Sequence, residues 1–308
     1  AGKRVAIGSA SGGFALMQEA FSFAGMAELP LVIAVSQRQA PATGVPTYSS
    51  QSDLQMITHS GHGEFSRIII APGDAEEAFL AGANGLNLAW KYQIPVIVLM
   101  DKILSEHSST SLLKTDGVKI ERGLISENTG EKYGRYEITE NGISPMAFPG
   151  TADTIVKVTS YEHDSAGITA DEADSVKAMI DKRFAKAKTL TEELSNQETV
   201  KVYGDQNSKN VIVFWGSTKG PVLEATKHLE TSVKLVQILW VEPFDTERVA
   251  RELKGAKKII NIECNHNGQM AALIREKTGI EMTNNILKYD SRPFEVGELV
   301  KQINGKLK

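Results

Sequence analysis

The 308-residue sequence contains one cysteine, Cys264. A single thiol excludes an intramolecular disulfide and an iron–sulfur cluster held only by cysteines of this chain, and we expect the cytoplasm as compartment. No uninterrupted apolar run approaches the roughly 20 residues of a membrane-spanning helix, and the first residues read as a strand start without a visible signal peptide, so no membrane association is predicted. The formal net charge of −4 lacks the basic excess that a broad nucleic-acid surface needs.

The overall composition, 41% hydrophobic and 23% charged, is ordinary for a globular protein. The chain is long enough for two domains. Strand and helix patterns alternate in the first third and resume after residue 210. Residues 102–205 between them are polar and turn-rich, apart from a charged helix near 170–193 that reads as solvated. Strands alternating with helices predict parallel sheets with both faces covered. We therefore expect an α/β fold with two doubly wound, mainly parallel-sheet domains joined by a polar connecting region.

The element ranges follow from the same patterns. Strands are predicted at residues 4–8, 29–35, 67–71, 94–100, 210–215, 233–239, 258–263 and 285–287. Helices are predicted at 14–26, 51–60, from the cap Asp74 to Tyr92, and at 221–229, 246–253, 269–278 and 296–303. Residues 9–13 are expected to form a glycine-serine turn.

The most informative stretch is the long polar loop that follows the apolar strand at 29–35. It begins with Arg38 and carries Pro41, Gly44 and Pro46. Ligands of open α/β sheets bind beyond the carboxyl ends of strands, and a loop of this length is usually functional or disordered. The prolines and the glycine favour a shaped loop. Arg38 would then offer a fork of donors to a carboxylate or phosphate, the alternative being an arginine that only caps the strand end.

Two glycine-rich turns lie between a strand and a helix, at residues 8–13 and 216–220. Backbone N–H groups in such turns can face an anion. The first does not have the dinucleotide spacing and the second does not have the P-loop spacing, because its lysine precedes the second glycine. A plain tight turn explains each of them as well.

Two histidines and a glutamate close together in the sequence suggest a metal site. His59, His62 and Glu64 follow none of the usual zinc spacings, so no metal site is predicted. His163 and Asp164 are expected to form a hydrogen-bonded turn pair, since no nucleophile lies nearby in sequence.

The end of the predicted strand at 258–263 carries a second polar segment. Cys264 is expected to be a buried, inert thiol. The following residues, 265–269, are either a helix cap or a contact for a partner subunit or coenzyme A.

Several motifs occur together in one order. The segments QRQAPATGVPT (37–47) and QSDL (51–54) are followed by GHGEFSR (61–67), KYQIPVIVLMD (91–101), RYEITENGISP (135–145), EHDSAGIT (162–169), WGSTKG (215–220) and ILKYDSRPF (286–294). The chain resembles, from about residue 5 to its end, the pyrimidine-domain alpha subunit of 2-oxoacid:ferredoxin oxidoreductases, most closely the 2-oxoglutarate enzymes.

The resemblance implies roles for two segments. Arg38 and Thr47 match the arginine and threonine that face the substrate, so Arg38 is expected to hold the 2-oxoacid carboxylate. The family's Thr-Ser-Gly-Pro-Gly-Phe lies near thiamine diphosphate; here the proline is missing. The cofactor-binding residues implied by that segment are Ser11, Gly12, Gly13 and Phe14.

The resemblance also implies an assembly. Residues 1–113 would be a pyrimidine-binding-like domain apparently without its N-terminal part, which in the family holds the activating glutamate, 114–205 a connecting region, and 206–308 a transketolase C-terminal-like domain. A beta subunit would carry Mg²⁺, the diphosphate site and a [4Fe-4S] cluster, coenzyme A would be the cosubstrate, and ferredoxin the electron acceptor. The alternatives are a noncatalytic or degenerate assembly subunit and a dinucleotide-binding dehydrogenase.

Overall fold

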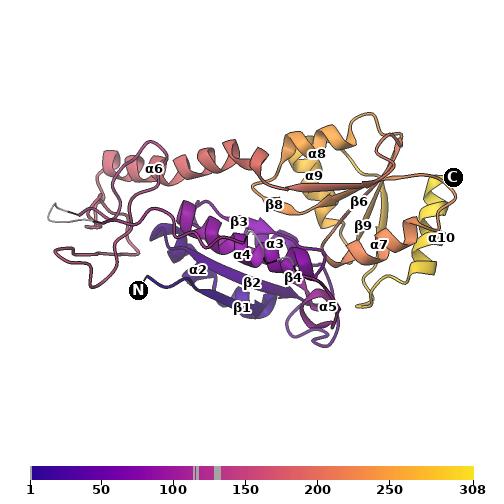
Figure 1. Cartoon of the computed structure of the whole chain (residues 1–308), viewed down its shortest axis with the longest axis horizontal. Helices are drawn as coiled ribbons and strands as arrows, with labels where there is room; N and C mark the ends of the chain where they lie inside the picture. The colour runs from indigo at the N-terminus through magenta and orange to yellow at the C-terminus, as the bar shows by residue number, and fades with distance from the viewer. Residues whose placement is uncertain (1, 114, 116–117, 128–132) are drawn as a thin grey trace.

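Two sheets of five strands each form the body of the protein, as the computed structural model shows for residues 2–113, 115, 118–127 and 133–308 (Figure 1). The strand orders are β1-β2-β4-β3-β8 and β10-β9-β6-β7-β5. In each sheet four strands are parallel, and the last strand of the order, β8 or β5, pairs antiparallel. The predicted α/β class with two mainly parallel sheets is confirmed.

The first sheet contains β1 (Ala6–Ala10), β2 (Leu31–Gln37), β3 (Ile68–Ile70), β4 (Pro95–Asp101) and β8 (Trp240–Glu242), with helices α1 (Ser11–Ala15), α2 (Gln18–Met26), α3 (Leu54–Thr58), α4 (Ala75–Tyr92) and α5 (Lys102–Glu106). The second contains β5 (Val200–Gly204), β6 (Asn210–Trp215), β7 (Lys234–Ile238), β9 (Lys258–Glu263) and β10 (Asn284–Leu287), with α7 (Lys219–Thr226), α8 (Thr246–Leu253), α9 (Gln269–Thr278) and α10 (Val296–Leu307). Helix α6 (Ala173–Glu192) lies between them in the chain, and 3₁₀ turns occur at η1 (Leu194–Asn196) and η2 (Gly216–Thr218).

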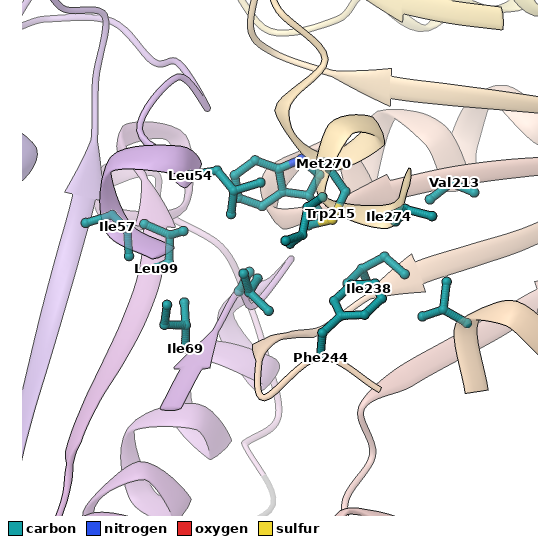
Figure 2. Packing of buried hydrophobic residues seen from close by; sticks show 14 of the residues in the cluster. Leu54, Ile57, Ile69, Leu99, Val213, Trp215, Ile238, Phe244, Met270 and Ile274 are labelled. Atoms are coloured by element: carbon teal, nitrogen blue, oxygen red, sulfur yellow. The ribbon is translucent and has the colours of Figure 1, made fainter. Parts of the chain in front are cut away.

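One apolar cluster runs from the first sheet into the second. Side chains of β3, β4 and α3 lie on one side, and side chains of β6, β7 and α9 on the other (Figure 2). Separate clusters cover the opposite faces, with α4 on the first sheet and α7 and α10 on the second. The two sheets therefore share a core.

The chain passes from one sheet to the other at Leu239, where sequence analysis predicts the end of a single strand at 233–239. The strand β7 ends at Ile238, and β8 then joins β3 of the first sheet. The N–H groups of Leu239 and Trp240 both donate to the carbonyl of Thr199 at 3.0 Å. Tertiary pairing divides an apolar run that looks continuous in the sequence. The strand β5 also lies in a stretch that sequence analysis treats as connecting.

The predicted turn at residues 9–13 is wrong, as is the single helix at 14–26. Strand β1 continues to Ala10, and the short helix α1 begins at Ser11. Met17, with φ −98° and ψ 6°, separates α1 from α2. The glycine pair is accommodated within a helical turn.

The prediction of a solvated helix at 170–193 is wrong for one face of α6. Lys182, Arg183 and Lys186 are buried. Lys182 Nζ donates to both carboxylate oxygens of Glu28 at 2.8 Å, and Lys186 also pairs with Glu28. The acidic partners, Glu28 and Glu162, lie far away in sequence, so the charge pattern of the helix alone cannot reveal them.

No described helix is long and apolar enough to cross a membrane. The three-part division at 113/114 and 205/206 stays a prediction.

Candidate functional site

The candidate site lies at the carboxyl ends of β1 and β2, which are parallel neighbours. Gln37 ends β2, and Arg38 opens the loop behind it. The carboxyl edge of a parallel sheet is where ligands bind in open α/β folds. The parallel pairing therefore brings the two predicted segments, 11–14 and 38–47, to the same edge of the first sheet.

The loop after β2 is shaped by its own backbone. The N–H of Val45 donates to the carbonyl of Gln39 at 2.9 Å, which closes a small antiparallel bridge. Gly44 has φ +53°, and a Cβ there would come within 1.9 Å of the Gln39 oxygen. Only glycine fits this position. The expectation of a shaped loop is confirmed.

Arg38 is half-buried at the base of this loop. Its guanidinium has no hydrogen bond or ion pair with any residue in the described part of the chain. Thr47 is exposed on the far side of the loop and lines a 230 Å³ cavity with Lys102 and His107. No hydrogen bond joins Arg38 and Thr47 among the described residues, so their joint action on one substrate stays a prediction.

The two glycines of segment 11–14 differ in the space around them. Gly12 has no atom within 4 Å of where a Cβ would stand, whereas a Cβ on Gly13 would come within 2.1 Å of Ser9 Oγ. Phe14 is fully buried and packs edge-to-face on Phe21, with ring centroids 5.4 Å apart. Phe14 therefore anchors the segment in the core, and Gly12 is its open position.

Asp53 is a residue that sequence analysis assigned no role. Its carboxylate is buried, and Oδ2 has no hydrogen-bond partner; the same holds for the buried Oγ of Ser11. Burial raises the pKa of Asp53, while the nearby Ser11 hydroxyl partly opposes this shift. Two buried polar atoms without partners need an explanation, and a bound ligand with N–H or O–H donors supplies one. Asp53 belongs to the QSDL motif (51–54), but nothing in that motif indicates a ligand-binding role for its carboxylate.

A polar cavity of 310 Å³ opens beside Asp53. It lies between the loop after β2 and the end of β9. Its lining includes Gln39, Pro41, Ser52, Asp53, Asn265, His266 and Tyr289.

The predicted segment 265–269 thus has two functions in the fold. Asn265 Oδ1 accepts from the N–H of Gly268 at 2.8 Å, and Glu263 accepts from the N–H groups of Met270 and Ala271. These bonds cap α9, as expected. The same segment faces the cavity.

Asp101 connects the end of β4 to the turn at 216–220. Burial raises the pKa of its carboxyl group, and Ser217 and Ser49 oppose this shift. Lys219, in the same turn, pairs with Asp74 and Glu77. The turn at 216–220 therefore contacts carboxylates of the first sheet.

The other sequence candidates have structural partners. His62 pairs with Glu19 at 3.4 Å on the surface, and the described residues contain no group of three or more His, Cys, Asp or Glu suited to a metal. Asp164 Oδ1 accepts from the N–H groups of Ala166 and Ile168 at 2.9 Å, which confirms the predicted turn. His163 stacks on Tyr136.

Cys264 is buried, and burial raises the pKa of its thiol far above the usual range. The predicted burial of the thiol is confirmed, and the raised pKa disfavours the reactive thiolate.

Residues present at the edge of the first sheet suit one end of thiamine diphosphate. The unpartnered atoms of Ser11 and Asp53 and the open position at Gly12 suit a ring that carries N–H donors, such as the aminopyrimidine. The sequence contains no Gly-Asp-Gly…Asn motif for the magnesium diphosphate end.

Comparison with known proteins gives the family. Residues 1–182 match the family described as "Pyruvate flavodoxin/ferredoxin oxidoreductase, thiamine diP-bdg". The 2-oxoacid:ferredoxin oxidoreductase subunit alpha of Saccharolobus solfataricus is 43% identical, over 98% of this chain and 49% of that protein. The 2-oxoglutarate synthase subunit KorA of Methanothermobacter thermautotrophicus is 28% identical, over 95% of this chain and 78% of that protein.

A solved structure agrees with these matches. The 2-oxoglutarate:ferredoxin oxidoreductase from Magnetococcus marinus, with 2-oxoglutarate, coenzyme A and succinyl-CoA bound, superposes with a TM-score of 0.89 and 32% identity, over 100% of this chain and 54% of that chain. The present chain spans about half the length of the curated 2-oxoacid:ferredoxin oxidoreductase alpha subunits that it matches. The motif order, the fold and these matches agree, and the chain belongs to the thiamine-diphosphate-binding pyruvate flavodoxin/ferredoxin oxidoreductase family.

Proposed function

We propose that the chain is part of an enzyme that oxidises a 2-oxoacid with coenzyme A to an acyl-CoA and CO₂. The two electrons go to ferredoxin, and the thiol proton is released. 2-Oxoglutarate is the favoured substrate, because the KorA relative and the Magnetococcus structure are named for it. The observation that carries the proposal is the Arg38 guanidinium, which has no hydrogen-bond or ion-pair partner among the described residues and lies at the base of a closed loop. The motif order matches this arginine to the family's substrate arginine.

In this proposal Arg38 grips the substrate carboxylate. A planar guanidinium can bind a carboxylate with two parallel hydrogen bonds, which fixes orientation as well as position. We expect Thr47 to contribute a hydroxyl to the same substrate.

Thiamine diphosphate supplies the electron sink for decarboxylation when it is bound. Ser11, Gly12, Gly13 and Phe14 would support its aminopyrimidine end, with Asp53 accepting a donor of that ring. The magnesium, the diphosphate site and the [4Fe-4S] cluster belong to a beta subunit, since this chain offers one buried cysteine and no diphosphate motif. We place the assembled complex in the cytoplasm.

The test is an assay of the chain alone and together with its co-expressed beta subunit. Each sample receives thiamine diphosphate, magnesium, coenzyme A, a 2-oxoacid and an artificial electron acceptor. We expect acyl-CoA only from the complex, with 2-oxoglutarate turned over at the highest kcat/KM. Turnover by the chain alone would contradict the shared site. A complex that binds thiamine diphosphate but oxidises no 2-oxoacid would favour an assembly role for this chain.

A further inference from the structure

The loop that carries Arg38 is held from both sheets. We define the Arg38 loop as residues 38–49 and the anchor segment as residues 50–55, which follows it. On the first sheet, Gln37 closes the base of the loop: its Oε1 accepts from the N–H of Asp53 at 3.0 Å, and its Nε2 donates to the carbonyl of Met100 at 3.4 Å. The remaining anchor bonds go to the second sheet.

Gln51 makes the densest of these contacts. It is fully buried, and it exchanges two bonds with Cys264: its N–H donates to the Cys264 carbonyl at 2.7 Å, and its Oε1 accepts from the Cys264 N–H at 2.8 Å. Its Nε2 donates to the carbonyl of Trp215 at 2.8 Å, and its own carbonyl accepts from Asn265 Nδ2 at 3.1 Å. One glutamine thus binds the ends of both β6 and β9.

Gln269 repeats this arrangement one turn further along the anchor segment. Its Oε1 accepts from the N–H of Gln55 at 2.9 Å, and its Nε2 donates to the carbonyl of Ser52 at 2.7 Å. The Gln51 carboxamide bonds backbone groups of the second sheet, and the Gln269 carboxamide bonds backbone groups of the anchor segment. Bonds to backbone groups fix the path of the anchor segment as well as its proximity.

The strand end that receives the anchor segment is itself rigid. Glu263 is fully buried and accepts from Trp215 Nε1 at 3.2 Å, from Asn265 Nδ2 at 2.7 Å and from the N–H of Met270 at 2.9 Å. A buried network in which the donors and acceptors are paired defines one arrangement of its members. The ends of β6 and β9 therefore present a fixed template to the anchor segment.

We propose that Gln51, supported by Gln269, is a positioning residue through which the second sheet sets the conformation of the Arg38 loop. The second sheet then takes part in substrate binding although none of its side chains need touch the substrate. The effect on substrate binding rests on the function proposed for Arg38; the effect on the loop does not.

The decisive variant is Gln51→Met, which keeps the length of the side chain and removes its two hydrogen bonds, to the Trp215 carbonyl and the Cys264 N–H. Its matched control is Gln55→Met, because the Gln55 side chain is exposed on the same segment and makes no hydrogen bond of its own. The first measurement uses the full chain and limited trypsin digestion. Cleavage after Arg38 is compared with cleavage after Lys119, an exposed site outside the described helices and strands.

Proteolysis in the fast-opening regime follows the population of the open form. We expect Gln51→Met to raise the Arg38-to-Lys119 cleavage ratio at least about tenfold, since two buried bonds of about 1 kcal/mol each are lost. Gln55→Met should leave the ratio within about twofold. An unchanged ratio in folded Gln51→Met protein would overturn the inference. If Gln51→Met does not fold, Gln269→Met is subjected to the same comparison, with a smaller increase expected.

The second measurement separates the inference from the proposed function. In the complex with the beta subunit, Gln51→Met should raise KM for the 2-oxoacid while the affinity for coenzyme A stays unchanged, and adding Arg38→Ala should cost less than it does in the wild type. A raised cleavage ratio with an unchanged KM would support the coupling of the second sheet to the loop and contradict the substrate role of Arg38.

Discussion

At the residue scale, the strongest consequence of the free Arg38 guanidinium concerns substrate affinity. Arg38→Ala should weaken transition-state binding by about 2–4 kcal/mol if the ion pair is desolvated, and Arg38→Lys should recover only part of it, because an ammonium is a point charge. Thr47→Ala should cost about 0.5–1.5 kcal/mol. Steady-state kcat/KM of the complex is the measurement. Arg251→Ala, on the surface of α8, is the control, and equal effects of both arginine variants would contradict the assignment.

Asp53 gives a prediction in which stability and ligand binding change in opposite directions. Its pKa is raised in the folded state by burial, so its contribution to stability is complete below the ordinary aspartate pKa and is lost as pH rises through the folded pKa. Asp53→Asn should therefore raise the melting temperature of the chain at pH 7. The gain should shrink as pH falls through the raised folded pKa and should reach its minimum below the ordinary aspartate pKa.

The same variant should bind thiamine diphosphate more weakly in the complex, because the amide no longer accepts with a charged oxygen. Calorimetric titration of the cofactor measures this effect independently of turnover. Ser208→Ala, at a surface turn of the second sheet, serves as the binding control. Unaltered cofactor affinity together with a raised melting temperature would mean that the Asp53 carboxylate does not face the ring.

At the element scale, α6 is held to the first sheet by a buried charge cluster. Glu28 lies between Lys182 and Lys186, and Arg135 donates to its backbone carbonyl at 2.7 Å. Glu28→Gln should cost about 3–5 kcal/mol of unfolding free energy, because it leaves buried ammonium groups without a counter-charge. Glu192→Gln, which affects an exposed pair on the same helix, should cost less than about 0.5 kcal/mol. Urea denaturation compares the two variants, and similar midpoints would contradict the stabilising role of the buried charge cluster.

The pH dependence of this cluster has a defined sign. Burial alone would raise the pKa of Glu28, but Lys186 and Lys182 hold it at about 2. A lowered carboxyl pKa stabilises the fold above the ordinary glutamate value, and this contribution is lost as pH falls toward the folded pKa. The difference between wild type and Glu28→Gln should therefore be largest near neutral pH and decline below about pH 4. A difference that is constant down to pH 2 would contradict this electrostatic account.

The predicted bounds of helices and strands agree with the structure where local sequence signals determine them. Helices α8 and α9 were predicted with their observed bounds, since Asp245 caps the first and Gly279, with φ +74°, ends the second. Strands β6 and β9 were predicted equally well from their buried apolar runs. The strand β8 has three residues and exists because β3 offers it an edge, which no local pattern contains.

In the candidate site, too, local patterns predicted some features and long-range contacts determined the others. Motif order identified the Arg38 loop, and Gly44 indicated its tight turn. Asp53 gained significance only when folding placed its unpartnered oxygen beside Ser11, and Gln51 only when it met the ends of β6 and β9. Both depend on contacts between segments more than 35 residues apart, which one sequence cannot provide.

At the scale of the whole molecule, the interface between the sheets is both apolar and polar. The shared core places Leu99 of β4 and Ile238 of β7 in one cluster (Figure 2). Beside it, Glu77 at the start of α4 accepts from Gln237 Nε2 at 2.7 Å and pairs with Lys219. Neither sheet retains a complete core without the other.

This shared core predicts that the described sheets unfold together. Ile238→Ala removes a fully buried side chain from the second sheet and should cost about 2–5 kcal/mol. If the two sheets unfold cooperatively, the lost stability lowers the protection of amides in both. Native-state hydrogen exchange should then show the same decrease in protection for amides of β4, such as Val96 and Ile97, as for amides of β6. Ile180→Ala, at a partly exposed position on α6, should lower neither set appreciably. If protection falls in β6 alone while the amides of β4 keep their wild-type exchange rates, the sheets are independent units. The second sheet could then unfold while the first stays folded. Its effect on the conformation of the Arg38 loop would depend only on the local opening equilibrium of the interface.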